Sequence, residues 1–102
     1  MDAAVESYEK ALTLKPEYPE AQNNIGNALN DLGKMGAAVE SYEKALTLNP
    51  EYPEAHNNLG NVLKDLGQLG AAVKCYEKAL TINPDYALAQ NNLDIALKEL
   101  SS

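Results

Sequence analysis

A 34-residue repeat runs through the sequence and limits the possible folds more than any other feature. Residues 37–70 match residues 3–36 at 27 of 34 positions, and residues 71–102 match residues 37–68 at 19 of 32 positions. All six tyrosines occupy only two positions of this repeat. A unit this short cannot enclose a core by itself, so the sequence predicts a stack of similar units that pack on their neighbours.

Each period has the pattern of two helices. In the first segment, apolar side chains recur at helical spacing, and Pro50 ends the helix because proline cannot donate the helical hydrogen bond. The second segment has Pro53 in its first turn and Gly67 as a left-handed cap. The two apolar faces consist of Ala38, Tyr42 and Ala45 in one segment and Ala55, Leu59, Val62, Leu63 and Leu66 in the other. No alternating strand pattern occurs in the sequence, so we predict an all-α fold of six helices.

Small residues recur where two helices of such a stack would cross closely. Gly26 and Gly60 occupy the same position of one helix type, and alanines recur in the other type. Small side chains facing large ones suit close helix packing. We therefore expect both glycines to lie at helix contacts.

The spacing of these residues resembles the signature of the tetratricopeptide repeat family. The matching residues are His56, Leu59, Gly60, Leu63, Ala72, Tyr76, Ala79 and Pro84, with His in place of the family's Trp and Leu in place of its first Tyr. The preceding period matches in the same way, so the resemblance covers the whole chain. It implies a right-handed superhelical α-solenoid of antiparallel helix pairs.

In the family's frame, residues 1–102 form a single domain with displaced repeat boundaries. We expect a half repeat at 1–18, full repeats at 19–52 and 53–86, and a capping helix at 87–102. In the last segment, Asp94 takes the place of the glycine and Ile95 takes the place of an asparagine. A glycine is unnecessary where no further helix packs closely, which is the reason for the capping assignment.

Composition excludes several classes of function. Fifteen acidic residues, eight lysines and no arginine give a net charge of −7, which disfavours nucleic acids and anionic membranes. A single cysteine cannot form an internal disulfide. The N-terminus lacks the basic start of a signal peptide, and no apolar run is long enough to span a membrane. We expect a cytoplasmic protein.

Asparagine is unusually frequent, and it gathers on one type of helix. Nine of the eleven asparagines lie there, although asparagine is a poor helix former. A carboxamide both donates and accepts hydrogen bonds, so a row of them can bind a peptide backbone whatever its charge. The predicted peptide-binding residues are Asn23, Asn24, Asn27, Asn57, Asn58, Asn61, Asn91 and Asn92. Mere solvation of an exposed face is the alternative interpretation.

The family resemblance implies where this asparagine face lies and which known binding surface it is similar to. It implies that the face lines the concave side of the superhelix, and the pattern is similar to the asparagine ladder of O-linked N-acetylglucosamine transferases. The family's clamp for acidic C-terminal peptides instead wants lysines and an arginine. Its positions map onto Asn23, Asn27, Asn58, Leu88 and Asn92, of which only Asn27 and Asn58 match. We therefore expect protein or peptide partners that are neutral to basic.

The remaining chemical groups do not indicate an enzyme. His56 has no nucleophile or second ligand at a recognisable spacing, which predicts a structural and partly exposed side chain. Cys75 replaces a serine of the other periods, so a packed thiol is expected. We predict no catalytic residue, no cofactor and no metal site.

Two other interpretations stay open. The chain could be a self-associating repeat fragment, natural or engineered, that stacks head-to-tail through its apolar terminal helices and has no ligand. It could also be a piece of a larger protein whose activity lies elsewhere. Identifying the partner would separate the binding interpretation from the self-associating one.

Overall fold

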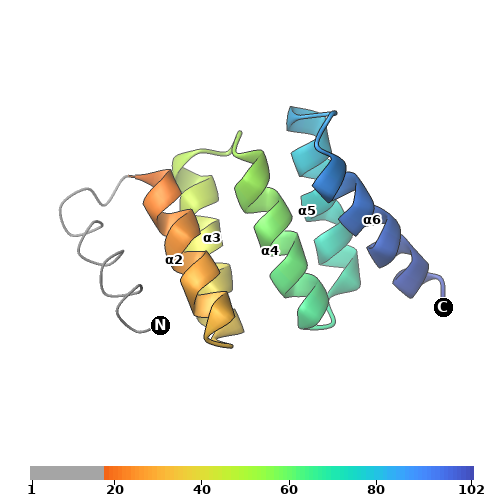
Figure 1. The fold of residues 1–102 in the computed structure, drawn as a ribbon, viewed down its shortest axis with the longest axis horizontal. Coiled ribbons are helices and arrows are strands. Elements are labelled where there is room, and N and C mark those ends of the chain that lie inside the picture. Colours follow the sequence, from red (N-terminus) through yellow and green to blue (C-terminus); the bar gives the residue numbers. More distant parts are fainter. Residues whose placement is uncertain (1–17) are drawn as a thin grey trace. The chain divides into compact units, whose positions relative to one another are not determined.

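The computed structural model describes residues 18–102, which contain five α-helices and no strand (Figure 1). They are α2 (Pro19–Asp31), α3 (Met35–Leu48), α4 (Pro53–Asp65), α5 (Leu69–Ile82) and α6 (Ala87–Leu100). The starts of α2, α4 and α6 are 34 residues apart, as are those of α3 and α5. The all-α fold is confirmed for this range. The first of the six predicted helices, at residues 2–15, lies outside the described residues.

The helix ends lie where the proline and glycine signals predict them. Helices α2 and α4 begin at Pro19 and Pro53, in the position where a missing N–H costs least. The left-handed glycines Gly33 and Gly67, with φ of 79° and 83°, follow their last turns. In both cases the glycine N–H and the next N–H bond back to carbonyls of the last turn, at 2.9 and 2.8 Å.

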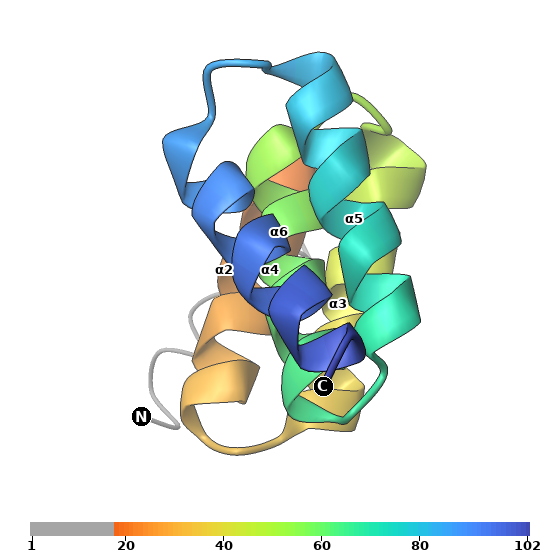
Figure 2. The same ribbon diagram turned by 90° about the vertical axis from the view of Figure 1, so that its right-hand side faces the viewer.

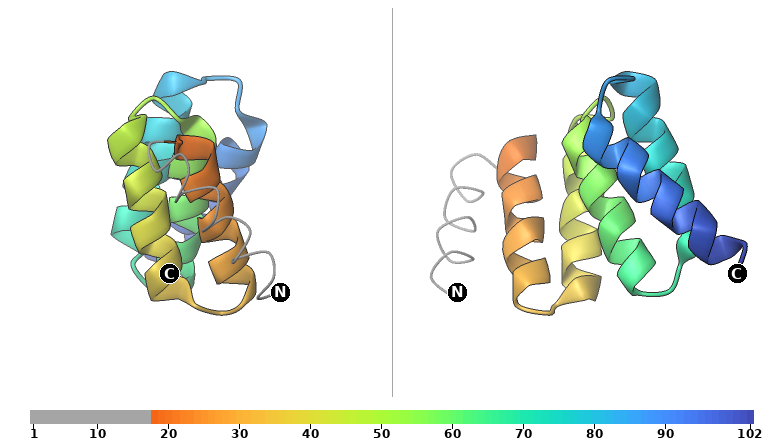
Figure 3. Two further views of the ribbon diagram at one scale, coloured as in Figure 1. Left: turned by 90° about the vertical axis from the view of Figure 1, so that its left-hand side faces the viewer. Right: turned by 45° about the vertical axis from the view of Figure 1, so that its right-hand side comes forward.

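The first of two compact units ends at Pro50. Within it, α2 and α3 run antiparallel and side by side (Figure 3). The predicted stripe of α3 is buried, with Ala38, Tyr42 and Ala45 at most 1% exposed. Ala21 and Ile25 are the buried apolar side chains of α2. The period-3.6 pattern therefore identified the packed face of α3.

The second unit, from Glu51 to Ser102, contains α4, α5 and α6 (Figure 2). Helix α5 packs against both α4 and α6, and α4 also contacts α6. Ala72, Tyr76 and Ala96 form a fully buried cluster at the centre of this unit. The partly buried side chains packed against the cluster are Leu63, Leu69, Val73 and Leu93.

One predicted core position is exposed, and so are apolar residues of α6, which the sequence predicts to be an apolar terminal helix. Leu66, assigned to the apolar face of α4, is 44% exposed because it is the residue that follows the last helical turn. On α6, Leu88, Ile95, Leu97 and Leu100 are between 44% and 56% exposed. Among the helices described for residues 18–102, none is long and apolar enough to cross a membrane. The right-handed superhelix stays a prediction.

Candidate peptide-binding site

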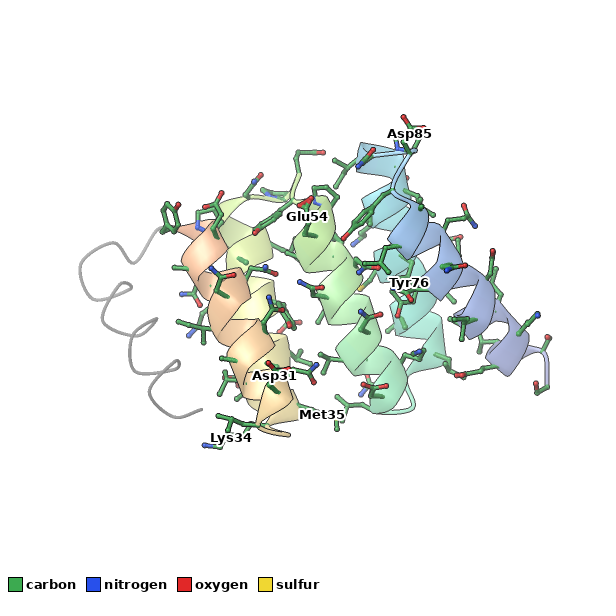
Figure 4. All side chains as sticks on the ribbon, in the orientation of Figure 1. Asp31, Lys34, Met35, Glu54, Tyr76 and Asp85 are labelled. Atoms are coloured by element: carbon green, nitrogen blue, oxygen red, sulfur yellow. The ribbon has the colours of Figure 1, made fainter. Side chains whose placement is uncertain are left out.

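In the second unit, a tyrosine of α5 occupies the space left by a glycine of α4. The Tyr76 side chain projects from α5 toward α4 and is fully buried (Figure 4). Its hydroxyl donates a 2.7 Å hydrogen bond to Oδ1 of Asn61. A Cβ atom on Gly60 would lie 2.6 Å from Cε1 of the Tyr76 ring, closer than side-chain atoms approach. Gly60 and Asn61 therefore form the seat for this tyrosine, one with space and the other with an acceptor.

The first unit repeats the arrangement with equivalent residues. Tyr42 is 1% exposed and donates a 2.6 Å hydrogen bond to Oδ1 of Asn27. A Cβ atom on Gly26 would lie 2.5 Å from the Tyr42 ring. The prediction that both glycines lie at close helix contacts is confirmed. We call each set of tyrosine, glycine and asparagine a tyrosine seat.

Burial suppresses ionisation of both seated tyrosines. Removal from water raises the pKa of Tyr42 to about 12, with a smaller contribution from the Asp31 carboxylate. Burial likewise raises the pKa of Tyr76 to about 12, and the Asp65 carboxylate adds to the effect. Both hydroxyls therefore stay protonated at neutral pH and remain hydrogen-bond donors to their asparagines.

A second amide contact joins α4 directly to α6. Nδ2 of Asn92 donates a 2.9 Å hydrogen bond to Oδ1 of Asn57, across 35 residues of sequence. Asn57 is completely buried, whereas Asn92 is half-buried and keeps access to solvent. Asn58, the next residue along α4, is also half-buried. The unit thus has a buried amide beneath amides that a ligand can reach.

The eight predicted peptide-binding asparagines fall into three groups. Asn24, Asn58, Asn61 and Asn92 are half-buried, Asn27 and Asn91 are exposed, and Asn23 and Asn57 are buried. For the two buried residues the prediction of direct ligand contact is wrong. Asn57 is covered because α6 packs beside α4 and its Asn92 side chain bonds to it. Asn61 and Asn27 each use their carboxamide oxygen in a tyrosine seat, and the Nδ2 group is not engaged by that bond.

The other groups weighed in the sequence are buried side chains. His56 is only 8% exposed, so the prediction of a partly exposed histidine is wrong. It lies three residues before Leu59 and therefore on the core-facing side of α4. Cys75 is buried on α5, as expected for a packed residue. No group of three metal-ligating side chains that could hold an ion occurs within residues 18–102.

The tyrosine seats were not predicted as hydrogen-bonded pairs. A signal for them exists in the sequence, since tyrosine follows asparagine by 15 residues in both pairs. The third copy changes both seat positions together, to Asp94 and Ile95. Correlated loss of the glycine and the asparagine indicates that the two residues serve one neighbour.

Comparisons with known proteins agree on the fold. The sequence matches the profile of the TPR repeat over residues 1–33 and 26–67, and that of the tetratricopeptide repeat over residues 53–86. Among curated proteins, no sequence matches.

Solved structures give the same assignment. The first TPR of Spaghetti (RPAP3), bound to the HSP90 peptide SRMEEVD, is 30% identical, with a TM-score of 0.95 over 99% of this chain and 80% of that one. The first TPR domain of human RPAP3 is 29% identical, with a TM-score of 0.95 over 98% and 79% of the two chains. The O-GlcNAc transferase of Thermobaculum terrenum is 32% identical, with a TM-score of 0.88 over 93% of this chain but 18% of that one.

Proposed function

The chain belongs to the tetratricopeptide repeat family, and we propose that it is a non-enzymatic interaction module that binds an extended peptide through asparagine side chains. The observation that carries the proposal is the set of half-buried carboxamides on α4 and α6, namely Asn58, Asn61 and Asn92. Such groups pair with the N–H and C=O groups of a peptide backbone. A similar repeat domain is described as bound to a peptide of HSP90, which supports this mode of action.

Charge favours peptides that are neutral to basic. The chain has a net charge of −7, and Glu54 and Asp65 are exposed at the two ends of α4. The clamp positions carry no cation to neutralise an acidic tail, since they hold asparagines and Leu88. Like charges slow the encounter and weaken the complex, most strongly at low salt. We therefore expect the module to bind a peptide through the peptide's backbone and not through the peptide's carboxylates.

Three matched peptides test this proposal. One is SRMEEVD, the second is SRMQQVN with an amidated end, which has no carboxylate, and the third is SRMKKVK, which replaces each acidic side chain with lysine. Titrations followed by NMR should shift the side-chain signals of Asn58, Asn61 and Asn92, with SRMEEVD binding most weakly at low salt. Added salt should narrow the difference. No shift of these signals with any peptide, or tightest binding of SRMEEVD, would contradict the proposal.

Self-association is the second candidate, and exposed apolar side chains on α6 favour it. Leu88, Leu97 and Leu100 are each about half exposed. A second copy of the chain that covers them would form an open head-to-tail stack. Asp94 opposes close packing because a carboxylate side chain stands where α4 has Gly60. Sedimentation across protein and salt concentrations separates the candidates, since a monomer at high concentration and high salt would exclude the stack.

A further inference from the structure

The buried side chain of Asn57 has one polar atom that packing does not explain. Its Oδ1 accepts the hydrogen bond from Asn92, but its Nδ2, within residues 18–102, is a buried atom with no hydrogen-bond partner. A buried donor without a partner destabilises a fold, and an apolar side chain of similar size would avoid that penalty. Asparagine at this position therefore has a use other than filling the core.

The Oδ1 atom of Asn57 restrains the side chain of Asn92 through the hydrogen bond that it accepts. The carboxamide of an asparagine rotates within a broad two-fold potential, so an unrestrained side chain exchanges its donor and acceptor positions. The bond to Asn57 removes this freedom by engaging one of the two Nδ2 hydrogens of Asn92. The second hydrogen and the Oδ1 atom of Asn92 are then held in fixed positions. Restraint before binding lowers the entropy lost when a ligand arrives.

We propose that Asn57 is a positioning residue that fixes the carboxamide of Asn92 for binding to the backbone of a peptide. Held in this way, Asn92 donates to one backbone carbonyl and accepts from one backbone N–H, which matches the chemistry of an extended peptide. The inference rests on the proposed function and adds a role for a residue that cannot itself contact the ligand.

Asn61 is restrained in a different way, which makes the two asparagines unequal. The Tyr76 hydroxyl donates to one of the two lone pairs on the Oδ1 atom of Asn61, at 2.7 Å. The carboxamide of Asn61 is therefore held through its oxygen, whereas that of Asn92 is held through its nitrogen. Only Asn92 keeps an Oδ1 atom that neither of these two bonds engages.

A double-mutant cycle tests the inference with the carboxylate-free peptide SRMQQVN-amide as the probe. Asn57→Leu removes the acceptor and the unpartnered donor, and it should weaken binding roughly 3- to 10-fold, the usual effect of one hydrogen bond. In an Asn92→Ala background, the same substitution should have no further effect, because its target is gone. The stability of Asn57→Leu should be equal to or higher than that of the wild type. Gln90→Ala, which removes another carboxamide from α6, is the control and should leave affinity unchanged.

The outcomes distinguish a failure of the proposed peptide-binding function from a failure of the positioning role of Asn57. If Asn92→Ala leaves affinity unchanged, the proposed function fails at this subsite. If Asn92→Ala weakens binding but Asn57→Leu does not, or if Asn57→Leu weakens binding equally in both backgrounds, the positioning role is overturned. Should Asn57→Leu fail to fold, the wild type alone decides: one Nδ2 proton of Asn92 should exchange with solvent more slowly than the other, and more slowly than those of the exposed Asn91. Signals typical of a free side chain would overturn the inference.

Discussion

Helices α4 and α6 occupy the same place in the repeat and lie in the same unit. They differ in the residues at the two positions that, on α4, contact a tyrosine of the next helix. On α4, Gly60 and Asn61 form a seat for the buried Tyr76. On α6, the equivalent residues are Asp94, which accepts a 3.0 Å hydrogen bond from Gln90 one turn earlier, and Ile95, which is 44% exposed. The helix that seats a tyrosine has both the glycine and the asparagine, and α6 has neither.

The difference indicates that the glycine and the asparagine are both needed to bury the tyrosine. The glycine alone would admit the ring but leave a buried hydroxyl without an acceptor. The asparagine alone would accept the hydroxyl, but a Cβ atom at the glycine position would displace the ring. Substitutions on the two helices should therefore differ in cost although the helices share one register.

The largest effect should come from removing the seated ring. Tyr76→Ala should lower the free energy of unfolding by about 3–5 kcal/mol, as large-to-small substitutions of buried aromatic residues do. Leu97→Ala on α6 should cost far less because Leu97 is 46% exposed. Chemical denaturation of both variants measures the difference. A loss below about 1 kcal/mol for Tyr76→Ala would show that the ring is not a core element.

A smaller effect should follow from filling the space beneath the ring. Gly60→Ala places a Cβ atom against the Tyr76 ring, and such overpacking costs about 1–3 kcal/mol even though alanine favours the helix. Asp94→Ala, at the same register on α6, should be neutral or stabilising because alanine is the better helix former. Equal effects of the two substitutions on the denaturation midpoint would contradict the comparison.

A still smaller effect should follow from raising the pH, which should lower the free energy of unfolding through each of the two seated tyrosines. The pKa of Tyr42 and of Tyr76 is about 12 in the folded chain, above the ordinary value of 10.0. The unfolded chain therefore loses these protons first, so stability is intact below pH 10 and decreases as the pH rises toward 12. At pH 11 the loss is about 1 kcal/mol for each tyrosine. Tyr76→Phe, which cannot ionise at this position, should reduce the loss, and an unchanged pH profile would contradict the assignment.

Much of the fold is predictable from local patterns. The buried stripe of α3 and the ends of α2 and α4 follow from apolar spacing, Pro53 and the left-handed Gly67, all of which act within a few residues. The 34-residue period then indicates that these elements recur. Leu66 was misassigned because the apolar spacing continues one residue past the helix end.

The candidate site is less predictable because it depends on contacts between distant residues. Asn57 and Asn58 are adjacent and identical in type, but only Asn57 is buried, since α6 covers one side of α4. That outcome depends on a contact 35 residues away. Composition indicates an asparagine-rich face, but it cannot separate the buried positioning residue from the half-buried contact residues.

The most direct test of the account measures peptide affinity after two asparagines of the second unit are removed together. The variant with Asn58→Ala and Asn92→Ala should keep or increase its helicity, because alanine is the better helix former. Calorimetric titration with SRMQQVN-amide should show weaker binding by about 1 kcal/mol for each lost hydrogen bond. An affinity equal to that of the wild type, in a variant with unchanged helicity, would contradict the claim that these carboxamides bind the peptide.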